Sequence, residues 1–239
     1  MSSDHGPDVE GAGQFASPPC FMHEIDPAYG GLAPDKTQAH NVARWRMAER
    51  ERLIAARLAL SPGDREKTAS LIARDLDTIV PEMPSTVISL YWPFRGEPDL
   101  RPWMATACAR ELRVALPIVI AKTQPLEFRE WRPDARMERG VWNIPYPADG
   151  AVVVPTVVIA SLVGFDPGGY RLGYGGGFFD RTLAALPAKP LTIGVGYSIG
   201  AVPTIYPQWH DLPMTWIITG NEVPRRGPVS AGKETVLKK

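Results

Sequence analysis

The chain alternates between segments with helical spacing of apolar residues and short runs of strand-forming residues. Apolar positions recur every three or four residues through 39–60 and 62–79, which predicts two amphipathic helices. Ser61 and Pro62, between them, suit an N-cap and a first helical turn. Strands are then expected at 86–92, 113–117, 126–131, 156–165, 191–197 and 215–219, and helices at 99–112 and 178–186. This alternation predicts an α/β fold: a single three-layer domain with a mostly parallel sheet flanked by helices.

Both ends of the chain lack this patterning. Residues 1–38 are rich in Gly, Pro, Ser and Asp and show no sustained period, which predicts an extension that is loop-like or disordered. Residues 222–239 are expected to form a solvated C-terminal tail. The α/β domain is therefore expected to span residues 39–221.

Composition and charge narrow the classes of function. The 239 residues are 44% hydrophobic, enough for a sizeable core, and 26 acidic side chains balance 26 Lys and Arg side chains. This balance argues against a nucleic-acid partner. There is no apolar run of membrane-spanning length and no signal-peptide pattern, and Cys20 and Cys108 give neither a disulfide framework nor a zinc spacing. We expect a cytoplasmic protein without a membrane partner, either a monomer or a weak homodimer.

The strongest chemical signal follows the buried strand expected at 156–165. The segment reads Arg171-Leu-Gly-Tyr-Gly-Gly-Gly-Phe-Phe-Asp-Arg181, a glycine-rich turn that leads into a helix. Glycines let a ligand approach the backbone, and free amides at a helix N-terminus bind anions. Arg171 and Arg181 add positive charge, and the Asp180 carboxylate is suited to hold Mg²⁺ beside phosphate oxygens. The alternative is a structural turn in which Asp180 caps the helix and the arginines lie on the surface.

This segment, preceded by Gly164-Phe-Asp166, resembles the signature of the 5-formyltetrahydrofolate cyclo-ligases, also called methenyltetrahydrofolate synthetases. Four further segments resemble that family in the same order along the chain. They are the helix with Arg46 and Arg50, Phe94-Arg-Gly-Glu-Pro-Asp99, Trp142-Asn-Ile-Pro145 and Tyr206-Pro-Gln-Trp-His-Asp-Leu-Pro-Met214. The resemblance implies an enzyme that uses ATP and Mg²⁺ to cyclise 5-formyltetrahydrofolate to 5,10-methenyltetrahydrofolate, with release of ADP and phosphate.

The resemblance also implies roles for individual residues. Arg171 and Asp180 are the expected catalytic residues, and Asp180 is also the expected ligand of Mg²⁺. The reduced folate is expected to bind Glu97, whose carboxylate suits the N–H donors of a pterin, and to lie against Trp142, Phe178 and Phe179. ATP is expected to contact the N-terminal helix and the glycine segment through Arg46, Arg50, Arg171, Gly173, Tyr174, Gly175, Gly176, Gly177, Phe178, Phe179 and Arg181.

Without the resemblance, several of these side chains have a structural alternative. Arg46 and Arg50 lie one helical turn apart, on a face where both can reach ATP, but a solvated helix face explains them as well. Glu97 is equally well explained as a loop residue, and Trp142 as a core or lid residue. A His210-Asp211 pair in a loop suggests either a metal or acid–base site or a structural turn.

Some positions depart from the family pattern. Thr215 stands where the family usually has an aspartate that contributes to the Mg²⁺ site, and threonine does not supply that charge. Phe178 and Phe179 replace tyrosines, Tyr146 replaces a glutamate and Arg46 replaces a lysine. Thr215 and the N-terminal extension motivate a second hypothesis, a degenerate paralogue that binds folate or nucleotide without turnover as a sensor or interaction module. A third, an unrelated sugar-phosphate or CoA-type enzyme, leaves the Trp-Asn-Ile-Pro segment unexplained.

Overall fold

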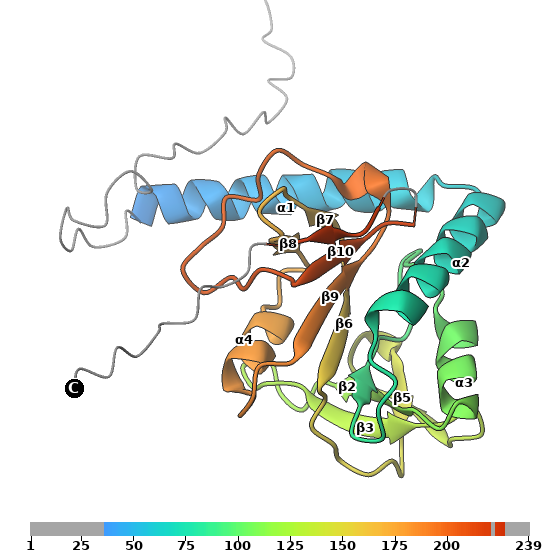
Figure 1. The fold of residues 1–239 in the computed structure, drawn as a ribbon. Coiled ribbons are helices and arrows are strands. Elements are labelled where there is room, and N and C mark those ends of the chain that lie inside the picture. The colour runs from blue at the N-terminus through green and yellow to red at the C-terminus, as the bar shows by residue number, and fades with distance from the viewer. Residues whose placement is uncertain (1–35, 221–222, 228–239) are drawn as a thin grey trace, which may run out of the picture. The chain divides into compact units, whose positions relative to one another are not determined.

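The computed structural model describes residues 36–220 and 223–227 (Figure 1). The chain divides into two compact units, Met1–Ala48 and Glu49–Lys239, with the boundary inside helix α1 (Lys36–Leu58). Of the extension expected at 1–38, the last three residues belong to α1, and the others lie outside the described residues. The expected domain limits stay predictions, and the whole sheet lies in the second unit.

Seven strands form one sheet in this unit: β1 (Val87–Ser89), β2 (Arg113–Ile118), β3 (Glu127–Trp131), β6 (Val157–Ser161), β9 (Leu191–Val195), β10 (Trp216–Ile218) and β11 (Arg225–Arg226). They stand in the order β11-β10-β9-β6-β1-β2-β3. The five strands from β10 to β2 are parallel, and the two edge strands are antiparallel to their neighbours. The prediction of a mostly parallel sheet is confirmed.

Helices cover both faces of this sheet. On one face, α2 (Pro62–Ile79) and α3 (Arg101–Ala109) contribute Leu76 and Met104 to a buried cluster that includes Ile159 of β6. On the other face, α4 (Phe178–Ala185) contributes Leu183 to a second cluster, with Val158. The adjacent residues Val158 and Ile159 belong to different clusters because successive side chains of a strand point to opposite faces. The predicted α/β fold with helices on both faces of the sheet is therefore confirmed.

The helices begin and end close to the positions that the sequence predicts. The pattern placed α2 at 62–79, as observed, and the hydroxyl of Ser61 accepts the amide hydrogen of Asp64 at 3.1 Å as the N-cap. Helix α1 is shifted by two or three residues from the expected 39–60. No helix in the described part of the chain is long and apolar enough to cross a membrane.

Short hairpins were not predicted. The apolar run at 156–165 is not one strand: β6 ends at Ser161, and β7 (Gly164–Phe165) then pairs with β8 (Arg171–Leu172) in an antiparallel hairpin. The run stays buried through the bend, so periodicity does not mark where the strand ends. A second hairpin joins β4 (Met137–Arg139) and β5 (Pro145–Pro147). In the expected C-terminal tail, β11 pairs with β10.

The parallel strands bring the segments of interest to one edge of the sheet. Ile88 of β1 is in register with Val157 of β6, so the segments that follow these two strands leave the sheet at their common carboxyl edge. Asp166 fixes the second of these segments. Its buried carboxylate accepts the amide hydrogens of Tyr170 and Ile205, both at 3.1 Å. The hairpin that carries Arg171 is thereby joined to the chain that follows β9.

Candidate active site

The loop between β8 and α4 has a backbone that requires glycine. Gly175 and Gly177 have φ angles of +91° and +63°, in the left-handed region that other residues rarely adopt. Gly177 is the N-cap residue of α4, and no side chain caps this helix. The amides of the first turn of α4 therefore face the loop without a side-chain acceptor, an arrangement suited to an anion.

Three arginine side chains surround this glycine loop. Arg50 donates from Nε to the carbonyl of Gly173 at 2.7 Å, and Arg181 donates from Nη2 to the carbonyl of Gly176 at 2.6 Å. Arg171 is 9% exposed. In the described part of the chain, the buried Nε atoms of Arg171 and Arg181 have no hydrogen-bond partner. Buried donors without acceptors are costly, and phosphate oxygens are acceptors of the right charge for them.

Two phenylalanine rings hold these arginines in place. The guanidinium carbon of Arg181 lies 5.1 Å from the ring centre of Phe178, and that of Arg171 lies 5.3 Å from the ring centre of Phe179. A Cβ atom at Gly176 would meet the Phe178 ring at 2.7 Å. The glycine at 176 therefore makes room for Phe178, so a side chain there would displace this ring first and any phosphate only indirectly.

Asp180, the expected ligand of Mg²⁺, is engaged at both carboxylate oxygens. Oδ2 accepts from Nη2 of Arg171 at 2.8 Å, and Oδ1 accepts from the amide of Leu212 at 3.3 Å. Among the described residues there is no group of three or more His, Cys, Asp or Glu side chains that could hold a metal ion. Thr215 is paired with Thr192 through their hydroxyls at 3.1 Å. A cation beside Asp180 would therefore take most of its ligands from phosphate and water.

Glu97, the expected folate ligand, is 6% exposed and surrounded by donors of the protein. The amide of Phe94 donates to Oε2 at 2.9 Å, and the hydroxyl of Tyr174 donates to Oε1 at 3.1 Å. Burial raises the pKa of the Glu97 carboxyl, while hydrogen bonds from Ser161, Phe94 and Tyr174 and the charge of Arg57 oppose this rise. Tyr174, predicted to contact ATP, thus connects the glycine loop to Glu97.

Arg57 is a functional candidate that the sequence analysis did not select. It is 3% exposed and donates to the hydroxyl of Tyr174 at 2.5 Å. Its position along the helix could have identified it. Arg57 follows Leu53 by four residues, so it lies on the same buried face of α1. Charge alone did not distinguish it from the exposed arginines of the helix.

Trp142 lies on a strained segment next to the glycine loop. Its side chain is 55% exposed, and its ring meets that of Phe178 edge-on, with 5.9 Å between the ring centres. Trp142 and Asn143 have φ angles of +57° and +60°, which are unusual for residues other than glycine. Strain of this kind is stored at functional sites, and an exposed indole offers a flat apolar face to a planar ligand.

Two further expectations concern residues outside this cluster. Asp211 closes a turn: its Oδ2 accepts from the amide of Gln208 at 2.7 Å, and its own amide donates to the Gln208 carbonyl at 2.8 Å. This favours the structural explanation of the His210-Asp211 pair, whose Nε2 and Oδ1 atoms are 3.9 Å apart. Arg46 belongs to the first unit, and its contact with ATP stays a prediction.

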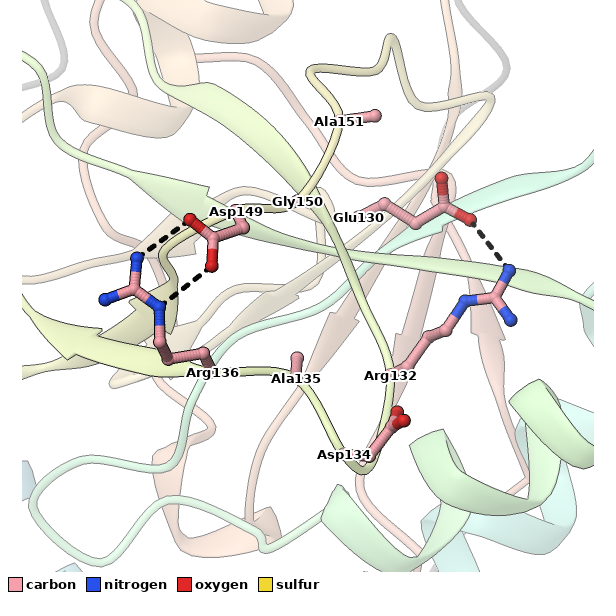
Figure 2. Close-up of a pocket in the computed structure, with 8 residues that line it drawn as sticks. All are labelled: Glu130, Arg132, Asp134, Ala135, Arg136, Asp149, Gly150 and Ala151. Carbon is pink, nitrogen blue, oxygen red and sulfur yellow. Dashed lines mark hydrogen bonds and ion pairs between the residues drawn. The ribbon is translucent and has the colours of Figure 1, made fainter.

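A separate hollow of about 310 Å³ lies beside the end of β3 (Figure 2). It is lined by Glu130, Arg132, Asp134, Ala135, Arg136, Asp149, Gly150 and Ala151. Arg136 is paired with Asp149 at 2.8 Å, and Arg132 with Glu130 at 3.8 Å. Since these charges compensate one another and none of the predicted site residues lines the hollow, the glycine loop remains the candidate site.

Comparison with known proteins identifies the family of this chain. The model of the 5-formyltetrahydrofolate cyclo-ligase family matches residues 42–220, three quarters of the chain. The chain belongs to the 5-formyltetrahydrofolate cyclo-ligase family. The family assignment is therefore confirmed. The matched range contains the glycine loop and Arg46, Arg50, Glu97 and Trp142, whose individual roles stay predictions.

Relatives of known name support the same assignment. The 5-formyltetrahydrofolate cyclo-ligase of Escherichia coli (strain K12) is 28% identical over 174 residues, which cover 70% of this chain and 96% of the relative. The solved structure of Aquifex aeolicus 5,10-methenyltetrahydrofolate synthetase is 27% identical, with a TM-score of 0.66, and covers 80% of this chain and 98% of its own. A synthetase structure from Mycoplasma pneumoniae, 23% identical with a TM-score of 0.61, covers 73% and 98% and supports the fold. The chain is therefore assigned as an enzyme of this family.

Proposed function

We propose that this cyclo-ligase binds ATP at the glycine loop and a reduced folate beside it, and converts 5-formyltetrahydrofolate to 5,10-methenyltetrahydrofolate with release of ADP and phosphate. The observation that carries the proposal is the convergence of Arg50, Arg171 and Arg181 on a glycine loop at an uncapped helix N-terminus. Such a site concentrates positive charge and amide donors around a phosphate chain.

The chemistry requires a better leaving group at the formyl carbon. Transfer of the γ-phosphoryl group to the formyl oxygen on N5 makes that carbon electrophilic. N10 then attacks it, loses its proton, and closes the ring as the bond between carbon and the phosphorylated oxygen breaks. Positioning and charge neutralisation suffice for such a transfer, and no covalent intermediate with the protein is needed.

The residues divide this work between the two substrates. Arg171 is oriented by Asp180 and buried next to the loop, which suits it to neutralise charge on the transferred phosphoryl group. Arg50 and Arg181 are held by carbonyls of the loop at its two ends and would steady the phosphate chain. Glu97 would accept hydrogen bonds from the pterin, and Trp142 with Phe178 would supply an apolar wall.

Mg²⁺ fits this site as an ion held mainly by the phosphates of ATP. Asp180 would be its protein carboxylate, since both its oxygens retain lone pairs beside the hydrogen bonds that they accept. Bound there, Mg²⁺ would neutralise phosphate charge. The arginines around the loop would share this task, which is consistent with a site that has a single carboxylate.

The decisive experiment follows the near-ultraviolet absorbance of methenyltetrahydrofolate during incubation with 5-formyltetrahydrofolate. We expect the absorbance to rise only when ATP and Mg²⁺ are both present, with ADP and phosphate released in equal amounts.

Arg171→Lys should lower kcat/KM by about 10²-fold, because lysine keeps the charge without the fixed fork of donors. Arg52→Lys, at an exposed position of α1 paired with Glu49, is the matched control. A rise without ATP, or an Arg171→Lys enzyme of normal activity, would contradict the proposal.

A further inference from the structure

A buried arginine contacts the glycine loop through the side chain of Tyr174. Arg57, in the last turn of α1, donates from Nη1 to the carbonyl of Leu162 at 3.3 Å and from Nη2 to the hydroxyl of Tyr174 at 2.5 Å. Within the described residues its buried Nε has no partner. Removing a guanidinium from water is costly unless hydrogen bonds and an opposite charge compensate it. Glu97 supplies an opposite charge, because the charge of Arg57 acts on its carboxyl.

Tyr174 connects the two charges. Its hydroxyl accepts from Arg57 and donates to Oε1 of Glu97 at 3.1 Å. Burial raises the pKa of the Tyr174 hydroxyl well above its ordinary value, so this group keeps its proton and remains a donor. Side chains from α1, from the glycine loop and from the segment after β1 thus form one continuous chain of hydrogen bonds.

The turn that carries Glu97 is also fixed by its backbone. Arg95 and Gly96 both have left-handed φ angles, +46° and +73°. The amide of Glu97 donates to the Phe94 carbonyl at 3.1 Å, and the hydroxyl of Tyr197 donates to the Gly96 carbonyl at 3.0 Å. One carboxylate oxygen is therefore directed by the Phe94 amide and the other by Tyr174.

Several charged or titratable groups surround Glu97. They come from α1, α2, the segments after β1 and β9, and the glycine loop, and they are Arg57, Arg65, Tyr91, Asp99, Tyr174 and Tyr197. Burial is the largest influence on Glu97 and raises the pKa of its carboxyl, whereas the charge of Arg57 lowers it. Tyr91 and Tyr197 are themselves buried phenols with raised pKa values, about 12 for Tyr197, so both are neutral near pH 7.

We infer that Arg57 and Tyr174 are positioning residues for the folate half of the site: they hold Glu97 as an oriented carboxylate that accepts hydrogen bonds from the ring N–H and amino groups of a reduced folate. The inference rests on the proposed function for the identity of that ligand. Neither residue contacts the reacting atoms. Their effect is exerted through the charge and orientation of Glu97.

The coupling itself is measured without any ligand. The ¹³C resonance of the Glu97 carboxyl, assigned by comparison with Glu97→Gln, is titrated in the wild type, Arg57→Met and Tyr174→Phe. Both substitutions should raise the pKa of Glu97, because one removes the cation and the other removes the hydroxyl donor. Tyr174→Phe retains the ring and its packing, so it keeps the test decisive if Arg57→Met fails to fold. Arg52→Met, at an exposed position of the same helix, should leave the titration unchanged.

The consequence for the substrate is measured by folate affinity from about pH 5 to about pH 9. In Tyr174→Phe and Arg57→Met, affinity for 5-formyltetrahydrofolate should fall by about tenfold or more at the acidic end and recover as the pH rises. In Arg57→Met, the KM for ATP should change little, because Arg57 is not among the residues expected to contact ATP. In a Glu97→Gln background, Arg57→Met should have no further effect on folate affinity, because the group through which it acts is absent.

The two measurements separate the possible failures. Variants that fold and leave the Glu97 titration where it is in the wild type would overturn the inference, whatever happens to activity. A wild-type protein that binds no reduced folate would overturn the proposed function, while the carboxyl titration would still decide whether Arg57 and Tyr174 control Glu97. Equal losses of folate and ATP affinity in Arg57→Met would indicate a general packing role and would also overturn the inference.

Discussion

Burying a charged side chain costs free energy because the charge is removed from water, and Glu97 is an example. Its carboxylate is buried, and the surrounding donors only partly offset the loss of water. An ionised group kept in such a place is evidence for a task other than stability, since a neutral side chain of the same shape would cost less. Replacing Glu97 by glutamine, a neutral side chain of the same shape, separates its contribution to stability from its contribution to ligand binding.

Glu97→Gln should make the protein relatively more stable as the pH rises. The folded pKa of Glu97 lies above its ordinary 4.5, so the wild type is favoured by the bound proton below that pH and loses this contribution as the pH rises through the folded pKa. Glutamine has no proton to lose. The difference in unfolding free energy, variant minus wild type, should grow with pH by about 1.4 kcal/mol for each unit of pKa shift. Urea unfolding of both proteins at a series of pH values above 4.5 measures this difference. A difference that stays constant or shrinks as the pH rises would refute the prediction.

Trp142→Ala should separate binding from folding at an exposed residue. The side chain is 55% exposed, so its loss should change the unfolding free energy by only about 0.5 kcal/mol. Loss of a stacking face should weaken reduced folate by about 1–3 kcal/mol, and ATP hardly at all. Calorimetric titration with each ligand tests this. Trp209→Ala, at an indole that is 91% exposed, is the matched control.

Thr215→Asp should lower the Mg²⁺ concentration needed for half-maximal turnover. The family resemblance implies a metal-ligating aspartate at position 215, so a carboxylate there should restore negative charge beside the expected cation. The Thr192 hydroxyl and amide, which now contact Thr215, are donors that can accommodate the new side chain. Thr215→Val, which removes the hydroxyl without adding charge, should leave the Mg²⁺ requirement unchanged. The same Mg²⁺ dependence in both variants would place Thr215 away from the ion.

At the residue scale, the sequence indicated candidate site residues but not the partners that the structure gives them. The glycine-rich pattern itself indicated Arg171 and Asp180, whereas Glu97 and Trp142 were indicated only by the family resemblance of their segments. Arg171 was predicted as a phosphate ligand and Asp180 as a metal ligand, whereas the structure joins them in an ion pair. The contact between Tyr174 and Glu97 spans 77 positions and depends on strand packing, so no local pattern could indicate it.

Among the elements, the glycine loop and the first turn of α4 act as one unit. Gly177→Ala should destabilise the protein by about 1–2 kcal/mol, because alanine is strained in the left-handed conformation at φ +63°. Its Cβ would also meet the Arg181 side chain at 2.8 Å. Gly63→Ala, in the first turn of α2, is the counterpart: the nearest atom to its Cβ is 3.9 Å away, and the change should stabilise the protein by up to about 1 kcal/mol. Thermal unfolding of both variants checks the pair, and shifts of the same sign would contradict it.

Elements with strong local signals were predicted well, and those that depend on tertiary pairing were not. The Ser61-Pro62 start of α2 is specified by cap chemistry within a few residues, so its position was correct. The two-residue strands of the β7–β8 hairpin have no period to detect, and their pairing depends on Asp166 contacts with a segment 39 positions away. Hairpins of this length are visible only once the fold is known.

For the second unit as a whole, strand order determines where the site can form. In the sheet, β2 lies beside β1 and β9 lies beside β6, so the β1–β6 pair is central. The segments that follow β1 and β6 leave the sheet at its carboxyl edge, where Tyr174 contacts Glu97. The alternation of strands and helices predicted the fold class because it is a property of the whole sequence. Strand order was not predicted, because nothing in a strand's own residues specifies its neighbour.

The central pairing of β1 with β6 has a consequence for the kinetics of refolding. The amide of Val87 bonds to the hydroxyl of Thr156 across 69 positions, and closing so long a loop makes parallel pairing slow. Helical signal should therefore recover first, and the ability to bind ATP should appear only in the slowest phase that is not limited by proline isomerisation. Stopped-flow refolding with prolyl isomerase present removes the phases due to the 25 prolines, and nucleotide added at successive delays reports the binding-competent fraction. Binding that returns together with the helical signal would mean that the glycine loop forms its cradle before the centre of the sheet has closed.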